Sequence, residues 1–187
     1  MNGPVLGAVL AGGRSSRFGS DKARALLDGR ALLDHVVAAL EPQVDAVLIC
    51  GRPHPVLPWV PDRPGPDLGP LGGLCAALSY ARDGGFAGVV SVGCDLPRLP
   101  DDLVGRLVGD GAAIVEGCPI VGYWPSPLAD DLLAHLGRGG THAVRAWART
   151  TGAREIRPAV PLLNVNTPAD LLRAAGEAPQ AASGRRA

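Results

Sequence analysis

The sequence has no excess of charge of either sign and no basic block. Its 187 residues carry 18 basic and 18 acidic side chains, which gives a formal net charge of zero. The longest basic run is the terminal pair Arg185-Arg186. Proteins that bind nucleic acid normally concentrate positive charge on one face, so the composition argues against nucleic acid as a partner.

Long apolar runs and paired cysteines are also missing. The apolar stretch from Val5 to Ala11 is far too short to span a bilayer, and no basic region precedes a cleavable apolar segment at the N-terminus. We therefore expect a cytoplasmic protein without a membrane partner. The cysteines form no C-x-x-C pair, which predicts buried reduced thiols rather than a zinc site or a disulfide framework. They are Cys50, Cys75, Cys94 and Cys118.

Lysine and asparagine are scarce, and their positions are informative. Of the 18 basic residues only Lys22 is a lysine, and apart from Asn2 the asparagines are Asn164 and Asn166. A chain that uses arginine almost everywhere is expected to keep a lysine where a compact, strongly hydrated ammonium is needed. Lys22 ends a glycine-rich stretch, and phosphate-binding lysines commonly occupy such stretches. It is therefore a candidate phosphate ligand.

Short apolar runs alternate with helical patterns along the chain. Such runs are typical of buried parallel strands, and apolar residues at helical spacing indicate the helices between them. We expect strands at residues 5–10, 46–50, 59–60, 89–92, 112–115, 120–123 and 162–166, and helices at 33–40, 70–78, 103–108, 128–136, after a cap at Thr141, and after a cap at Thr167.

This alternation predicts an α/β fold of three layers. A mostly parallel central sheet should carry helices on both faces in a Rossmann-like arrangement. We expect one domain over residues 1–175 and a disordered tail over residues 176–187, where the composition turns to Ala, Gly, Ser and Arg. Ligands of such folds bind at the carboxyl ends of the strands. The loops after Leu10, Cys50, Gly93 and Asn166 are therefore the places to look for chemistry.

The loop from Leu10 to Lys22 follows the first expected strand directly. It reads LAGGRSSRFGSDK and contains three glycines, two arginines and the lysine. Glycines let the backbone approach a ligand, and the cations neutralise a polyphosphate. The loop matches neither the Walker pattern nor G-x-G-x-x-G. A solvated surface loop would have a similar composition, but the position after a buried strand favours a ligand site.

At these residues the chain resembles the nucleotidyltransferases that include molybdenum cofactor guanylyltransferase. The loop is similar to that family's L-A-G-G-x-x-x-R-M-G-x-D-K signature, with Phe18 in the place of the Met. Further similarities follow in order along the chain. They are Gly69-Pro70-Leu71-Gly72-Gly73, Cys94-Asp95-Leu96-Pro97 and the stretch NVNTPADL from Asn164 to Leu171.

The resemblance implies a nucleotidyltransferase fold and a set of site residues. Lys22, Arg17 and Asp95 would be catalytic, with Lys22 and Arg17 on the phosphates. Asp95 would hold Mg2+, and Asp62, which aligns only by its distance from Gly69, would help to bind the nucleoside. Cys50 stands where the family has an asparagine that contacts the base. The implied nucleotide-binding residues are Leu10, Ala11, Gly12, Gly13, Lys22, Cys50, Asp62, Gly69 and Asp95.

Carboxylate and amide oxygens suit Mg2+, which keeps several waters and needs few protein ligands. Asp95 at a strand end fits as the principal ligand, although an Asp turn into Leu96-Pro97 would also explain it. Asn166 is a candidate second ligand, and a role in capping the last helix is an equal alternative. A helix that begins with Pro70-Leu71-Gly72-Gly73 needs either a close ligand or sheet contact or tight packing to tolerate its glycines.

The resemblance implies transfer of GMP from GTP to the terminal phosphate of molybdopterin, with release of pyrophosphate. Molybdoenzyme apoproteins or chaperones would be further partners. A phosphate acceptor is already an anionic nucleophile, and the four histidines do not cluster along the chain. The alternatives are a cytidylyltransferase for the same acceptor, a transferase for another small phosphate, and a non-catalytic nucleotide-binding module. The missing glycine fingerprint disfavours a dinucleotide-dependent oxidoreductase.

Overall fold

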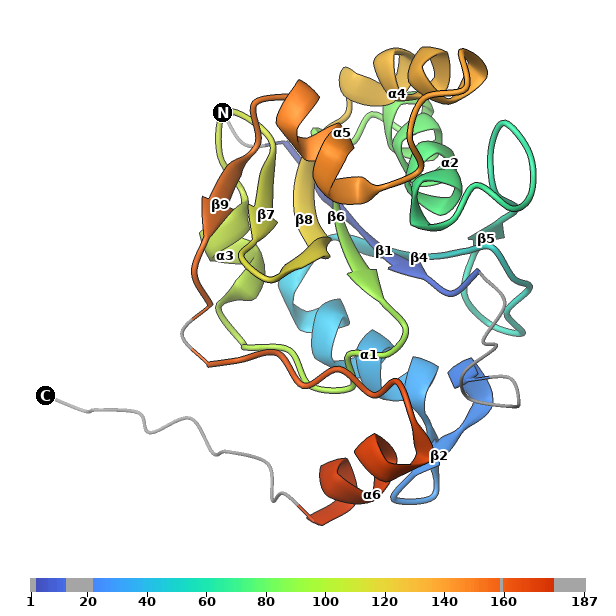
Figure 1. Ribbon diagram of the computed structural model, residues 1–187, viewed down its shortest axis with the longest axis vertical. Coiled ribbons are helices and arrows are strands. Elements are labelled where there is room, and N and C mark those ends of the chain that lie inside the picture. Colours follow the sequence, from blue (N-terminus) through green and yellow to red (C-terminus); the bar gives the residue numbers. More distant parts are fainter. Residues whose placement is uncertain (1–2, 13–21, 159, 177–187) are drawn as a thin grey trace, which may run out of the picture.

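The computed structural model describes residues 3–12, 22–158 and 160–176. Its main element is a seven-stranded sheet with the strand order β5-β4-β1-β6-β8-β7-β9 (Figure 1). The strands are β1 (Val5–Leu10), β4 (Ala46–Cys50), β5 (Trp59–Val60), β6 (Gly88–Gly93), β7 (Ala113–Val115), β8 (Cys118–Pro125) and β9 (Arg154–Ile156). A separate two-stranded hairpin is formed by β2 (Leu26–Leu27) and β3 (Arg30–Ala31).

The sheet is parallel except at one strand. β5, β4, β1 and β6 run in the same direction, and β8 is antiparallel to both of its neighbours, β6 and β7. β9 pairs parallel with β7. The ends of β1, β4, β6, β7 and β9 therefore lie along one edge of the sheet, together with the beginning of β8, and the predicted mostly parallel sheet is confirmed.

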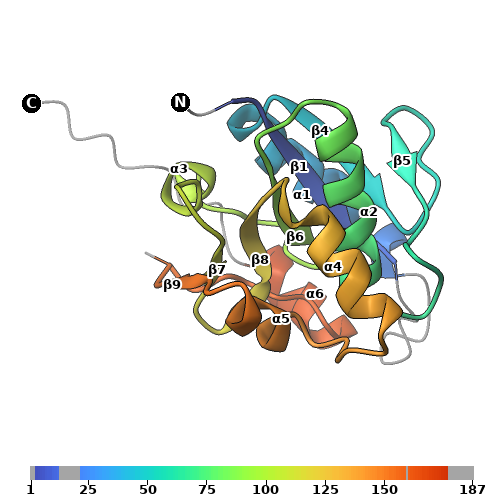
Figure 2. The same ribbon diagram turned by 90° about the horizontal axis from the view of Figure 1, so that it is seen from above.

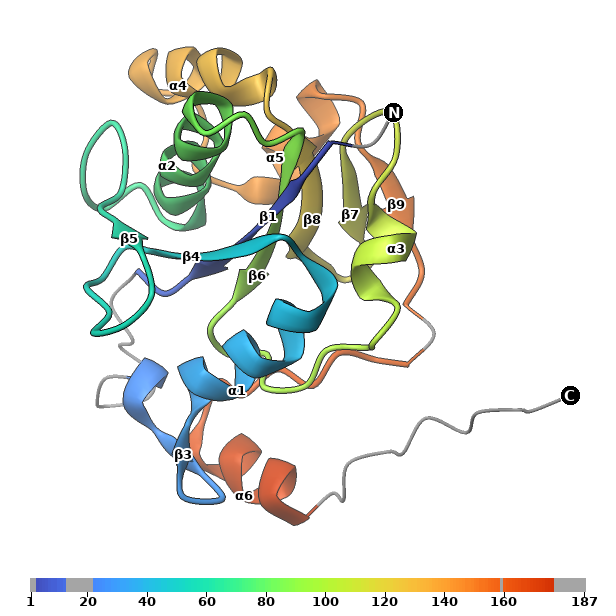
Figure 3. The ribbon, with the colours of Figure 1, turned by 180° about the vertical axis from the view of Figure 1, so that it is seen from behind.

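Helices cover both faces of the sheet. They are α1 (Leu32–Leu40), α2 (Pro70–Asp83), α3 (Leu103–Leu107), α4 (Leu128–Gly137), α5 (Val144–Thr150) and α6 (Pro168–Gly176), with 3-10 turns at Lys22–Arg24 and Glu41–Gln43. Figure 1 shows α2, α4 and α5 in its upper part and α1 and α6 in its lower part. Figure 2, seen from above, shows α2 beside α4, and Figure 3 shows the face that carries α1 and α3.

The core is divided by the sheet, because alternate residues of a strand point to opposite faces. In β1, Leu6 and Ala8 pack with α2, α4 and α5, whereas Val5 and Val9 pack with α1 and α3. All six residues of β1 are buried, as a strand covered on both faces requires. The three-layer α/β arrangement expected from the sequence is therefore present.

Most expected elements form, but residues 162–166 are not a strand. This segment crosses the molecule between β9 and α6 without joining a ladder. Its backbone is held by other partners: the Val165 N–H donates to the Asp95 carbonyl at 2.9 Å, and the Asn166 N–H donates to the Asp170 carboxylate at 3.0 Å. The strand predicted over residues 162–166 is therefore wrong, although Val165 is buried.

Two smaller differences concern strand β9 and the cap of α5. β9 joins the edge of the sheet beside β7 although Arg154 and Glu155 are exposed. Helix α5 begins one residue after Ala143, and the Thr141 hydroxyl accepts only a 3.3 Å bond from the Ala143 N–H, so Thr141 is not its cap. Within the described residues, no helix has both the length and the apolar character that crossing a bilayer requires. The predicted tail over residues 176–187 begins one residue too early, because Gly176 ends α6, and residues 177–187 lie outside the described residues. The single domain stays a prediction.

Candidate active site

The loops singled out from the sequence meet at the carboxyl edge of the sheet. Leu10 at the end of β1 lies opposite Cys50 at the end of β4 on one side and Gly93 at the end of β6 on the other. The Ala11 N–H donates to the Cys50 carbonyl at 2.9 Å. The first loop thus begins in the middle of this edge, between the loops that follow β4 and β6.

The loops after β1 and β4 are in backbone contact at two glycines. Gly51 has a φ of 86°, and a Cβ added to it would lie 2.6 Å from Gly12 Cα and 2.7 Å from Gly12 N. A side chain at Gly51 would therefore be both strained and obstructed. Gly51 is not among the site residues predicted from the sequence, although its position after an apolar strand is a signal for such a turn.

Asp62, shortly after β5, reaches the same place. A Cβ added to Gly12 would lie 3.3 Å from Asp62 Oδ2, and one added to Gly51 would lie 3.0 Å from Asp62 Oδ1. Among the described residues, Asp62 Oδ1 is buried and has no hydrogen-bond partner. Burial raises the pKa of this carboxyl above 3.8. A buried acceptor without a partner is costly, so the carboxylate is suited to donors that a ligand would bring.

The glycines at the start of α2 serve close packing. A Cβ added to Gly72 would lie 3.1 Å from Asp62 Cβ, and one added to Gly73 would lie 3.2 Å from Leu10 Cδ2 and 3.3 Å from Cys50 Cβ. The first turn of α2 is therefore seated directly on the ends of β1 and β4. Gly69 precedes the helix with a φ of 59°, and the 14-residue helix directs its positive end toward this side of the sheet.

Lys22, Asp95 and Asn166 form one polar cluster. Lys22 Nζ donates to Asp95 Oδ2 at 3.0 Å and to Asn166 Oδ1 at 2.7 Å. The side chains of Lys22 and Asp95 are 12% and 20% exposed. Asp95 is two residues beyond the end of β6, and Lys22 begins a 3-10 turn. The structure therefore joins three residues that the sequence separates by 73 and 144 positions.

The cap of α6 fixes the backbone beside Asn166. The Asp170 carboxylate accepts hydrogen bonds from the Thr167 N–H at 2.8 Å and the Thr167 hydroxyl at 2.9 Å, and the Thr167 hydroxyl accepts one from the Asp170 N–H at 3.2 Å. The Thr167 hydroxyl, followed by Arg173, lowers the pKa of Asp170 to about 2. Thr167 is thus the cap, as predicted, and the side chain of Asn166 is directed to Lys22 instead.

The donor set fits a small hard cation only in part. The described residues contain no group of three or more His, Cys, Asp and Glu side chains that would hold a metal. Asp95 and Asn166 nevertheless bring two side-chain oxygens to one cationic atom, the ammonium of Lys22. Such a pair, completed by water and substrate phosphate, is the type of ligand set that Mg2+ accepts.

The cysteines near the site are thiols without disulfide bonds. All four cysteines are free, and Cys50 is fully buried beneath α2. Burial raises the pKa of Cys50, and Asp62 raises it further. Burial likewise raises the pKa of Cys94 to about 11, with a contribution from Asp95. Both thiols therefore stay neutral at physiological pH, and Cys50 lies under the site as a packing residue with its carbonyl on Ala11.

Several predicted residues fall elsewhere. Gly13 and Arg17 lie outside the described residues. The histidines do not gather at the site: His35 bonds to the Leu27 carbonyl at 2.8 Å, His135 bonds to the Thr141 carbonyl at 3.0 Å, and His54 accepts from the Leu57 N–H at 2.9 Å. The bonds described for these three histidines are all to backbone groups, and none is to Lys22, Asp95 or Asn166.

The fold is that of nucleotidyltransferases. A crystal structure of molybdopterin-guanine dinucleotide biosynthesis protein A from Archaeoglobus fulgidus superposes with a TM-score of 0.75 at 22% identity, covering 91% of this chain and 97% of that one. A cytidylyltransferase for 2-C-methyl-D-erythritol 4-phosphate from Thermus thermophilus superposes with a TM-score of 0.70 at 16% identity, covering 94% and 98%. The same fold thus occurs with different nucleotides and acceptors.

The sequence places the chain within this class. The family model of the MobA-like NTP transferase domain matches residues 7–159, and the chain belongs to that family. A molybdenum cofactor guanylyltransferase from Rhizobium leguminosarum bv. trifolii is 36% identical over an alignment that covers 91% of each protein. The family resemblance drawn from the glycine loop and the three later motifs is therefore confirmed.

Proposed function

We propose that this nucleotidyltransferase transfers GMP from GTP to the terminal phosphate of molybdenum cofactor, with Mg2+ as its metal ion. The observation that carries the proposal is the cluster of Lys22, Asp95 and Asn166 beside the glycine contact of the first two loops. The nucleotide and the acceptor are taken from relatives such as the Rhizobium protein, which is named a molybdenum cofactor guanylyltransferase. The fold alone does not select them, because it also occurs in a cytidylyltransferase.

GTP is expected over the ends of β1 and β4. There Leu10 is buried and Ala11 is half-buried, but Gly12 is exposed and has no side chain, so a ligand would approach the backbone at Gly12. Asp62 supplies a carboxylate oxygen without a partner among the described residues. The N–H groups of guanine and the ribose hydroxyls are donors of the kind this oxygen needs. Gly13 follows Gly12 in the sequence, and Gly69 precedes α2, whose first turn lies on the ends of β1 and β4. Both glycines belong to the proposed nucleotide set.

Lys22 is expected to bind the phosphates together with Arg17. In nucleotidyl transfer the protein contributes mainly positioning and electrostatic stabilisation, and the ammonium of Lys22 is already fixed by two side-chain oxygens. Asp95 and Asn166 would hold Mg2+, which would neutralise charge on the triphosphate. Asp95 itself is fixed through its carbonyl, which accepts the Val165 N–H at 2.9 Å.

The reaction needs no general base from the chain. An oxygen of the acceptor phosphate, whose second pKa is about 6, attacks the α-phosphorus of GTP. The bond from that phosphorus to the oxygen bridging to the β-phosphate breaks, and the electron pair leaves with pyrophosphate. The task of the chain is to orient the two phosphates in line and to stabilise the charge that develops on the leaving group.

Incubation of the protein with molybdopterin, Mg2+ and each of the four NTPs tests the proposal, with the product identified by mass. The expected product is the guanine dinucleotide of molybdopterin, formed with an equal amount of pyrophosphate. The cytosine dinucleotide would establish cytidylyl transfer instead. Bound nucleotide without any product would indicate a non-catalytic module. Removal of divalent ions with EDTA should stop the reaction, and added Mg2+ should restore it.

A further inference from the structure

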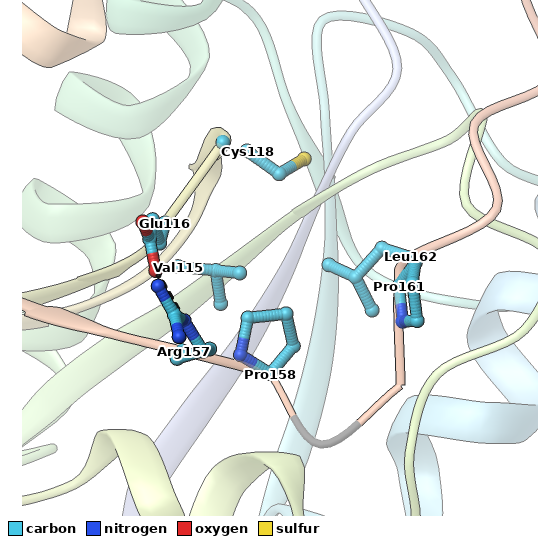
Figure 4. A pocket seen from close by; sticks show the side chains of 8 residues that line it. Val115, Glu116, Cys118, Arg157, Pro158, Pro161 and Leu162 are labelled. Atoms are coloured by element: carbon cyan, nitrogen blue, oxygen red, sulfur yellow. Dashed lines mark hydrogen bonds and ion pairs between the residues drawn. The ribbon is translucent and has the colours of Figure 1, made fainter.

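A cavity of about 510 Å³ opens in the half of the sheet that contains β7, β8 and β9. It lies between the β7–β8 turn, which contributes Val115, Glu116 and Cys118, and the segment after β9, which contributes Arg157, Pro158 and Leu162. Figure 4 shows Val115, Pro158 and Leu162 facing one another across it. Pockets for small ligands commonly have volumes of about 300–1,000 Å³. The cavity is large enough for a fused ring system.

The cavity shares the edge of the sheet with Asp95. β8 runs antiparallel to β6, so Cys118 at the beginning of β8 lies beside the end of β6, where Asp95 follows. Burial raises the pKa of Cys118, and the charge of Asp95 raises it further, which agrees with this proximity. On the other wall, Leu162 is three residues before Val165, whose N–H is bonded to the Asp95 carbonyl. The proposed GTP site over β1 and β4 and the cavity therefore flank Asp95.

The walls of the cavity are apolar and its rim carries charge. Pro158 and Leu162, which are partly buried, present flat or branched apolar surface that suits the faces of a planar ring, whereas Val115 is a fully buried residue of the wall. At the rim, Arg157 Nε donates to Glu116 Oε2 at 3.0 Å, and the two side chains are 84% and 48% exposed. An ion pair so exposed contributes little to stability. Glu116 and Arg157 can therefore separate and bind a ligand instead, at a small cost in free energy.

The backbone around the rim is fixed although its side chains are exposed. The Glu116 N–H donates to the Ile156 carbonyl at 2.8 Å, and Arg106 Nη2 donates to the Arg157 carbonyl at 2.6 Å. The carboxylate and the guanidinium are therefore presented from defined positions on opposite segments. A site whose backbone is already ordered loses less entropy when a ligand binds.

We propose that this cavity binds the pterin ring of the acceptor, with the ring faces on Pro158 and Leu162 and the pyrimidine edge at Glu116 and Arg157. The inference rests on the proposed function. The amino-pyrimidinone edge of a pterin has adjacent N–H donors for a carboxylate and a carbonyl for a guanidinium. In the acceptor, the phosphate lies at the end of the molecule away from that edge. A ring seated in the cavity thus directs its phosphate toward Asp95 and Lys22.

Steady-state transfer with molybdopterin and GTP tests this placement in the full-length protein. Leu162→Trp fills the cavity and Glu116→Gln removes the carboxylate. Each should raise the KM for molybdopterin about tenfold or more, while the KM for GTP and the melting temperature remain those of the parent. The matched control is Glu155→Gln, because Glu155 forms an exposed 3.4 Å ion pair with Arg145 that does not line the cavity. The control should leave all three quantities unchanged.

The outcomes separate this inference from the proposed function. A folded Leu162→Trp variant that keeps the KM for molybdopterin within about twofold of the parent overturns the placement. If Leu162→Trp does not fold, Glu116→Gln decides in the same assay, because Glu116 is exposed. A parent protein that makes no dinucleotide from molybdopterin overturns the proposed function instead.

Discussion

Replacement of Lys22 by methionine tests the centre of the site with little change in side-chain length. The ammonium is lost, and with it the 3.0 Å bond to Asp95 and the 2.7 Å bond to Asn166. Because both oxygens stay partly accessible to water, we expect the free energy of unfolding to fall by only about 1–2 kcal/mol. A typical domain, which is stable by about 5–15 kcal/mol, remains folded after such a loss.

The same substitution should have a much larger effect on turnover. A fixed cation at the leaving phosphates acts on the transition state, and loss of one such group typically lowers kcat about 10²–10³-fold. Initial rates of dinucleotide formation at saturating GTP, together with thermal melting, measure the two effects separately. Arg82→Met is a suitable control, because Arg82 lies in the last turn of α2, away from the site, and pairs with Asp83 and with Asp130 of α4. It should leave kcat unchanged.

Lys22→Arg keeps the positive charge but replaces the compact ammonium by a planar guanidinium. A planar guanidinium does not reproduce a point contact with two oxygens from different segments, so we expect this variant to recover only part of the lost rate. Since Lys22 is the only lysine, reductive methylation modifies a single side-chain amine, and GTP should protect it. If Lys22→Met retains kcat within about tenfold of the parent, the assignment of Lys22 to the phosphates is wrong.

Further predictions concern the residues around the cluster. Asp62→Asn removes a charge that burial disfavours, because burial raises the pKa of Asp62 above 3.8. The ionised carboxylate therefore lowers the free energy of unfolding at pH values above the raised pKa, and this loss disappears below pH 3.8. The variant should melt no lower than the parent at pH 7 yet bind GTP about tenfold more weakly by calorimetry; normal binding would contradict this. Gly51→Ala should lose about 2 kcal/mol or more of unfolding free energy, whereas Gly29→Ala, at a φ of 78° with no atom within 4 Å, should lose about 1 kcal/mol. Equal losses in urea denaturation would show that the Gly12 contact is unimportant. Because the pKa of Asp170 is lowered to about 2 from 3.8, its stabilisation is present above pH 3.8 and is lost as the pH falls through about 2. Thr167→Ala should raise this pKa in an NMR titration, and an unchanged midpoint would contradict the capping role.

The sequence predicted those parts of the fold and site that local pattern determines. The buried runs of β1, β4 and β6 are continuous and apolar, so their ends, and with them Leu10, Cys50 and Asp95, could be placed on one edge of a sheet. Thr167-Pro168-Ala169-Asp170 contains its own capping partners, and the helix start was correct. The glycines of α2 allowed two explanations, and only the packed structure shows that they bring the helix onto Leu10, Cys50 and Asp62.

What the sequence could not predict depends on distant partners. β9 has two exposed charged residues and a single half-buried isoleucine, so it lacks the period of a strand and is ordered by pairing with β7. Residues 162–166 have the pattern of a strand, but the Asp95 carbonyl and the Asp170 carboxylate take the bonds that a ladder would need. The cavity between the β7–β8 turn and this segment follows from the same long-range arrangement.

The ion pair between Lys22 and Asp95 has a consequence for the order of binding. Each of the two groups already satisfies the other, so a triphosphate must compete with Asp95 for the ammonium, and a divalent ion must compete with Lys22 for the carboxylate. When the triphosphate binds Lys22, the Asp95 carboxylate becomes available to the divalent ion. When the ion binds Asp95, the Lys22 ammonium becomes available to the triphosphate. Nucleotide and metal should therefore bind with positive cooperativity, and by thermodynamic reciprocity each should tighten the binding of the other by the same factor.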